Sequence, residues 1–201
     1  MMPDGNPRPY RNTSERYGRI AISLHWFIAA LVAALLAVGT LMVNLPIGHD
    51  WSFPLFQWHK SLGILVFLTI CVRLIWRHIN PQPQLPEEMP LWERWLARAT
   101  HLAFYAILFV MPLSGWAIVS TSPYNIPTYF LGLIELPPLP YLSSHPDKLI
   151  WNERLSEFHE IAAWLLGILI LAHVAAAIRH HVVKKDGILR RMAPWISEKT
   201  L

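Results

Sequence analysis

The sequence predicts an all-α integral membrane protein, a bundle of four helices that span a bilayer. Of its 201 residues, 54% are hydrophobic and only 15% are charged, whereas about a quarter of the residues of an ordinary soluble domain are charged. Long uncharged runs recur four times, each of a length that crosses the hydrocarbon core as a helix. The basic residues lie beside these runs and form no basic face with aromatic residues between them, which predicts a lipid partner and no nucleic acid.

The four spanning helices are expected at about residues 20–43, 53–76, 99–119 and 158–179. The first lies within a stretch of thirty residues, 20–49, that carries no formal charge. The second contains Lys60 and Arg73 near its two ends, where long side chains can reach the membrane surface. Pro112 predicts a kink in the third helix.

The distribution of Lys and Arg predicts the orientation, because cytoplasmic flanks carry the excess of these residues. Fourteen of the 17 Lys and Arg lie on the side that contains both chain ends, so both termini are expected in the cytoplasm. Residues 1–18 then form a solvated cytoplasmic tail, residues 19–182 the helical domain, and residues 183–201 a second cytoplasmic tail.

Two connections between the helices differ in character. Residues 78–91 are rich in proline and are interpreted as a spacer without a core. In residues 120–156, an apolar stretch at 129–134 is flanked by Pro123, Pro127, Pro137, Pro138 and Pro140. This longer connection is expected to lie along the outer surface of the bundle, where it caps the bundle or shapes a pocket.

A single cysteine, Cys71, excludes several kinds of redox and metal site. It rules out a disulfide framework, a zinc site built on paired cysteines, a four-thiolate iron–sulfur cluster and covalent haem attachment through a C-x-x-C-H motif. Metal chemistry would therefore depend on the ten histidines of the chain.

Four histidines occupy two depths in the predicted bundle. His25 and His173 each lie six residues inside the arginine that bounds their helix on the cytoplasmic side, about 9 Å from that edge. His59 and His159 stand at the outer ends of the second and fourth helices. Ionisable or metal-binding side chains within spans are costly to bury, so these four are candidates for function.

The spacing along the fourth helix suggests two stacked centres. His159 and His173 are fourteen residues apart, about 40° short of four full turns, so both leave one face about 21 Å apart. His59 and Arg73 have the same spacing, which places a guanidinium at the inner level. Imidazoles facing each other across a bundle suit the two axial positions of haem iron, and this interpretation predicts a bundle with two haem layers. Non-haem iron, copper, zinc and simple interhelical hydrogen bonds are the alternatives.

Several runs of residues also carry a family resemblance. They are Tyr17-Gly18-Arg19-Ile20 leading to His25-Trp26, Trp58-His59-Lys60-Ser61-Leu62-Gly63, Thr100-His101-Leu102, Met111-Pro112-Leu113-Ser114-Gly115, Phe158-His159-Glu160, Leu171-Ala172-His173 and Lys184-Lys185-Asp186. In these runs the chain resembles the bacterial cytochrome b561 family, over nearly all of its length after the tail. It is most similar to the short four-helix members, which include the bacterial superoxide oxidase.

The resemblance implies two non-covalent b haems. His25 and His173 would ligate the iron on the cytoplasmic side, and His59 and His159 the iron on the periplasmic side. His101 stands at the inner level, and we expect it, like Arg73, to contact a haem propionate or support the inner site rather than ligate iron.

The resemblance further implies a multi-pass enzyme of the bacterial inner membrane that oxidises superoxide to dioxygen and reduces ubiquinone. Lys60 is the residue expected to attract superoxide, unless it only extends to the membrane surface. The connection 120–156 is a hypothesis for part of the quinone or donor site. The same haems would serve an electron conduit between quinone and a partner dehydrogenase, hydrogenase or cytochrome. A metal-handling or transport protein with bare histidines is a third possibility.

Overall fold

The computed structural model of the chain describes residues 8–46, 48–86 and 88–196. Residues 1–7 and 197–201, with Lys199 of the predicted tail, lie outside the described residues. The elements in chain order are α1 (Arg19–Asn44), α2 (Ser52–His78), α3 (Leu91–Thr121), β1 (Thr128–Phe130), β2 (Ile134–Leu136), α4 (Pro140–Ser143), α5 (Lys148–Arg179), the π-helix η1 (His180–Lys184) and α6 (Ile188–Met192).

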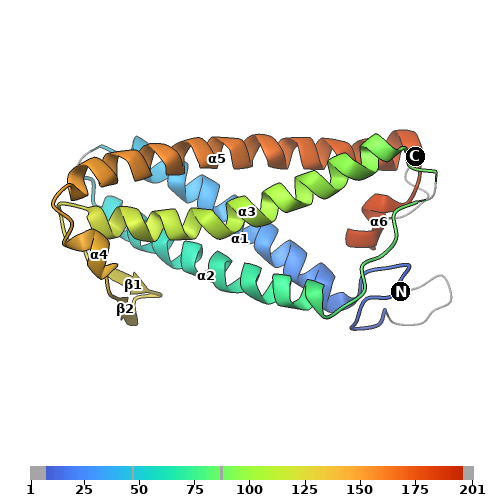
Figure 1. The fold of residues 1–201 in the computed structure, drawn as a ribbon, viewed down its shortest axis with the longest axis horizontal. Coiled ribbons are helices and arrows are strands. Elements are labelled where there is room, and N and C mark those ends of the chain that lie inside the picture. The colour runs from blue at the N-terminus through green and yellow to red at the C-terminus, as the bar shows by residue number, and fades with distance from the viewer. Residues whose placement is uncertain (1–7, 47, 87, 197–201) are drawn as a thin grey trace.

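Four long helices run side by side, as the sequence predicted (Figure 1). Each of the four is long and apolar enough to cross a membrane. Only 11–17% of the residues in their most apolar windows are buried, so most of these side chains keep some exposed surface, which lipid would cover. The predicted class, a helical membrane bundle, is therefore confirmed.

Two of the helices are longer than their apolar segments. α3 begins at Leu91 and α5 at Lys148, eight and ten residues before the expected starts. Hydropathy detects only the part of a helix that crosses hydrocarbon, whereas the first turns of α3 and α5 carry charged and aromatic residues typical of the interface. α3 also continues through Pro112 without ending.

A hydrophobic core occupies the middle of the bundle. Its buried members come from all four long helices, and they are Ile28, Leu31, Val32, Val66, Ile70, Leu108 and Leu166. On α5, Leu166 lies midway between His159 and His173, and on α1 the core residues follow His25. The apolar core thus separates two histidine levels, one toward each end of the bundle.

The chain segments at the inner end are packed, which corrects two expectations. Residues 8–18 keep much of their surface exposed but are not a free tail: Asn12 Nδ2 donates to the Pro81 carbonyl at 3.0 Å, and Asn12 Oδ1 accepts from Gly18 N at 2.9 Å. The proline-rich connection is not a bare spacer, since Gln84 N donates to the Ser14 carbonyl. Gly18 is required by this packing, because a Cβ there would lie 2.3 Å from the carbonyl oxygen of Tyr10.

The outer connection contains a short hairpin that the sequence did not predict. β1 and β2 pair antiparallel, with Tyr129 opposite Glu135, and Figure 1 shows this hairpin at the end of the bundle opposite α6. Ser61 of α2 attaches it, because its Oγ donates to the Tyr129 carbonyl and accepts from Leu131 N, both at 3.0 Å. The connection therefore does cap part of the outer end, two residues along α2 from His59.

Candidate functional site

The structure brings the four histidines together in two pairs of the same geometry. His25 of α1 faces His173 of α5, with ring centroids 6.3 Å apart and ring planes at 64°. His59 of α2 faces His159 of α5, with centroids 6.3 Å apart and planes at 66°. The depths of the four histidines in the sequence predicted these two pairs, and α5 contributes one member to each.

The spacing of each pair fits two ligands on opposite sides of one metal. Two metal–nitrogen bonds of about 2 Å in line separate imidazole centroids by roughly 6 Å. Within the described residues, no group of three or more His, Cys, Asp or Glu side chains is placed to hold a metal ion. Because zinc sites take three or four protein ligands, two imidazoles alone fit an iron whose other ligands come from a macrocycle.

Each histidine pair joins two helices that are not closely packed against each other. α5 packs along α3, and α1 packs along α2, whereas neither α1 nor α2 makes more than slight backbone contact with α5. Both histidine pairs cross this looser boundary. A flat macrocycle between the imidazoles is therefore compatible with the backbone arrangement.

Glycines lie against both rings of the outer pair. A Cβ at Gly39 of α1 would stand 3.2 Å from His59 Cε1, and a Cβ at Gly115 of α3 would stand 3.6 Å from His159 Cε1. At Gly63 and Gly167, a Cβ would meet no atom within 4 Å. The residues present thus fit bound haem, because the imidazoles of the outer pair pack against glycines and two other glycines have open space beside them.

The outer histidines differ in their hydrogen bonds. His159 Nδ1 lies 2.8 Å from Ser114 Oγ. His59 Nδ1 is buried and has no partner at hydrogen-bond distance, although the Leu35 backbone lies near it. The outer pair therefore holds one imidazole in a fixed orientation and one that is positioned chiefly by packing.

Lys60 lies beside the outer pair and holds the hairpin. Its Nζ donates to the Pro127 carbonyl at 3.1 Å and to Thr128 Oγ1 at 3.4 Å. Its amino group lies next to His59 in sequence, at the outer end of α2. Lys60 therefore anchors the hairpin, in addition to any effect of its charge on an incoming anion.

The inner pair adjoins a cationic pocket. Its lining consists of Asn12, Tyr17, Ala21, Arg73, Trp76, Arg77, Gln82, His101, Tyr105 and Met192. The pocket opens to solvent, and its cavity volume is about 30 Å³. Arg73 Nη1 donates to the Ala21 carbonyl at 3.2 Å, and the indole N–H of Trp76 is buried without a partner. The donors and charge of this pocket suit a carboxylate.

His101 is close to the inner pair but is engaged elsewhere. Its ring centroid lies 5.9 Å from that of His173. Its Nδ1 donates to the Ala97 carbonyl at 2.8 Å, within its own helix. The structure therefore places His101 beside His173, where it can contact a group bound at the inner level.

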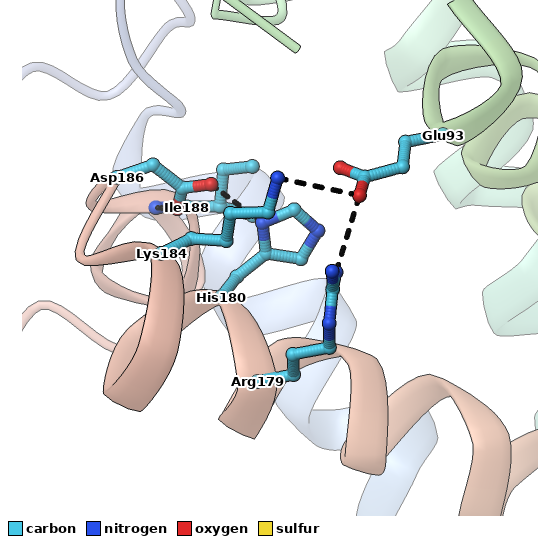
Figure 2. Close-up of polar contacts among 6 residues, drawn as sticks. All are labelled: Glu93, Arg179, His180, Lys184, Asp186 and Ile188. Atoms are coloured by element: carbon cyan, nitrogen blue, oxygen red, sulfur yellow. Dashed lines mark hydrogen bonds and ion pairs between the residues drawn. The ribbon is translucent and has the colours of Figure 1, made fainter. Parts of the chain in front are cut away.

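Sequence reasoning missed the polar cluster that fixes the C-terminal segment. The Glu93 side chain, only 6% exposed, accepts with its Oε1 from Arg179 at 3.2 Å and from Lys184 at 3.4 Å (Figure 2). His180 and Asp186 form a second pair beside it. Glu93 falls in the stretch 91–98, which has no long apolar run, so no sequence signal indicated that this carboxylate is buried.

A helical membrane bundle with two opposed histidine pairs defines the class of membrane b-type cytochromes. The model of the family described as prokaryotic cytochrome b561 matches residues 16–195. The chain belongs to this family, and the predicted family resemblance is confirmed. The protein is accordingly a membrane cytochrome with an electron-transfer role, and its family implies bound haem b.

Three relatives match the chain over nearly their full lengths. "Cytochrome b561 homolog 2" of Escherichia coli is 34% identical over 184 residues, covering 91% of this chain and 94% of the relative. "Cytochrome b561 homolog 1" of the same organism is 31% identical, covering 89% and 97%. "Probable superoxide oxidase CybB" of Yersinia pestis is 25% identical, covering 90% and 97%.

Proposed function

We propose that this protein is a superoxide:ubiquinone oxidoreductase that holds two haem b groups. His25 and His173 ligate the inner haem, and His59 and His159 ligate the outer one. The observation that carries the proposal is the pair of equal 6.3 Å imidazole separations at two levels of one bundle. The relative named as a probable superoxide oxidase supports the choice of substrate.

The reaction balances with two superoxide ions for each ubiquinone. Each superoxide loses one electron and leaves as dioxygen, and the quinone takes up two electrons and two protons to become quinol. Bound haem supplies a one-electron carrier at each histidine level. With two histidines of the chain holding each haem, no position at the iron would remain for superoxide, which favours outer-sphere transfer.

The chain's other residues take supporting roles in this proposal. The positive charge of Lys60, next to His59 at the outer end, attracts superoxide. Arg73 and His101 at the inner end hold haem carboxylates, as the donors of the adjoining pocket suit. The hairpin of the connection 120–156 lies beside the outer pair and forms part of a donor or quinone site, which its attachment to Ser61 supports.

We also propose the placement in the cell. The protein lies in the bacterial inner membrane, with residues 8–18 and α6 on the cytoplasmic side and the hairpin on the periplasmic side. The excess of Lys and Arg at the end that carries both of these segments supports this orientation. Superoxide then reacts at the periplasmic surface, where the outer histidine pair lies.

The test is quinol formation by the purified chain in the presence of a steady superoxide source, a ubiquinone analogue and catalase. We expect quinol to form only with the protein present, and superoxide dismutase to suppress the reaction. His59→Ala and His159→Ala should abolish it. Protein that carries two haems yet forms no quinol beyond the dismutase-treated control would refute the superoxide reaction.

A second candidate function is an electron conduit between quinone and a partner redox protein, which is compatible with the names of two relatives because those names give no substrate. The relatives at 34% and 31% identity are named only as cytochrome b561 homologs. A conduit would contain the same haems but would reduce quinone only when its dehydrogenase, hydrogenase or cytochrome partner is added. The quinol assay on the single polypeptide therefore separates the two functions.

A further inference from the structure

Ser114 of α3 contacts a histidine of the outer pair from outside the ligand set. Its side chain is buried, with 6% of the residue exposed. Its Oγ lies 2.8 Å from the Met111 carbonyl oxygen and 2.8 Å from His159 Nδ1. One hydroxyl thus makes two short contacts, one within its own helix and one to α5.

A count of hydrogens assigns the direction of both bonds. A serine hydroxyl has one hydrogen, and a carbonyl oxygen can only accept. If the hydroxyl donated to His159, then Ser114 Oγ and the Met111 oxygen would be two acceptors facing each other at 2.8 Å without a hydrogen between them. The hydroxyl therefore donates to Met111, and Nδ1–H of His159 donates to Ser114 Oγ.

We propose that Ser114 is a positioning residue that selects the tautomer of His159 and tunes the outer haem. With the hydrogen on Nδ1, a neutral imidazole carries its lone pair on Nε2, the atom left for a metal. A bond from the distal N–H also fixes the ring and makes the ligand more basic. This inference rests on the proposed function, in which His159 is a haem ligand.

The contact distinguishes the outer site from the inner one. Among the described residues, no hydroxyl or carboxylate makes a comparable bond to His25, His59 or His173. A more basic axial ligand stabilises the oxidised iron and lowers its reduction potential. Ser114 therefore lowers the potential of the outer site alone, which favours transfer of electrons from the outer level to the inner level.

The experiment compares Ser114→Ala, which removes the hydroxyl, with Ser114→Thr, which keeps it. Thr69→Val is the matched control, because Thr69 is a buried hydroxyl on α2 that bonds only to the Leu65 carbonyl of its own helix. Each purified variant is assayed for haem content, for both midpoint potentials by optical redox titration, and for the two low-spin ferric signals by electron paramagnetic resonance.

We expect Ser114→Ala to raise one of the two midpoint potentials and shift one ferric signal. Ser114→Thr should restore both, and Thr69→Val should leave all four values unchanged. Unchanged potentials and signals in a two-haem Ser114→Ala protein would overturn the proposal, as would an equal shift of both haems. If Ser114→Ala loses the outer haem and Ser114→Thr keeps it, the positioning role of the hydroxyl is supported. If both variants lose the outer haem, side-chain packing explains the loss and the proposal is overturned.

His159→Ala separates this inference from the proposed function. If that variant still binds two haems, the ligand assignment itself is wrong, and the proposed function fails with it. If His159→Ala loses one haem and Ser114→Ala changes neither potential nor signal, only the positioning role fails.

Discussion

Gly39 offers a test of the outer site whose magnitude follows from the structure. An alanine Cβ at this position would stand 3.2 Å from His59 Cε1, a few tenths of an ångström inside comfortable contact. Overpacking typically costs about 1–3 kcal/mol, and so small an overlap belongs at the low end, about 1 kcal/mol. We expect the His59 ring to give way when no haem is bound, so that the cost falls on haem binding, which should weaken about fivefold.

Gly115→Ala is the matched control for Gly39→Ala. Its Cβ would lie 3.6 Å from His159 Cε1, an ordinary van der Waals distance. Both substitutions gain about 0.5–1 kcal/mol of helix stability by replacing glycine, so this contribution cancels between them. The two imidazoles that these substitutions approach, His59 and His159, belong to the same pair. The distance from the new Cβ to the imidazole is therefore the main difference between the two variants.

The assay is titration of haem into haem-depleted protein in detergent, followed by absorbance. Gly39→Ala should weaken one of the two binding steps and leave the other unchanged, Gly39→Leu should weaken the same step further, and Gly115→Ala should match the wild type. Equal haem binding by Gly39→Leu and the wild type would refute the packing of Gly39 against a haem ligand.

Three further changes probe other parts of the molecule. Glu93→Gln removes the carboxylate shared by two cations, so we expect faster proteolysis of the C-terminal segment and a lower unfolding temperature; Glu157→Gln, in an exposed ion pair, should change neither. Lys60→Met should slow superoxide-driven quinol formation and make the rate less dependent on salt concentration, whereas Lys60→Arg should have a rate near that of the wild type. Equal rates in all three proteins would exclude attraction of superoxide by this charge. Arg73→Leu should lower retention of the inner haem only, as haem analysis at equal protein shows; equal loss of both haems would contradict its placement.

The sequence was sufficient to predict the bundle and the two histidine levels, because both follow from helix geometry. A helix rises by a fixed amount per residue, so fourteen residues between His159 and His173 determine their separation and their common face. The depth of His25 and His59 followed from the charges and ends that bound their helices. The structure places each of these two opposite the member of α5 at its own level.

Features that depend on tertiary contact could not be predicted in this way. Residues 8–18 pack because Asn12 finds an acceptor at Pro81, far along the chain, and a donor at Gly18 of its own segment, and the contact to Pro81 follows from no local pattern. The hairpin strands have three residues each, too short for an alternating pattern to be recognised. Glu93 resembles any surface carboxylate until α5 and η1 bring its two cations to it.

The most direct test of the account is the number of haems bound by the chain and by its four single histidine-to-alanine variants. The protein is purified after expression with ample haem, and haem is quantified against protein from the reduced-minus-oxidised spectrum. We predict two low-spin b haems per chain, and one in each of the variants at His25, His59, His159 and His173. A chain without haem, or a variant that retains both haems, would contradict the assignment of two haems to two histidine pairs.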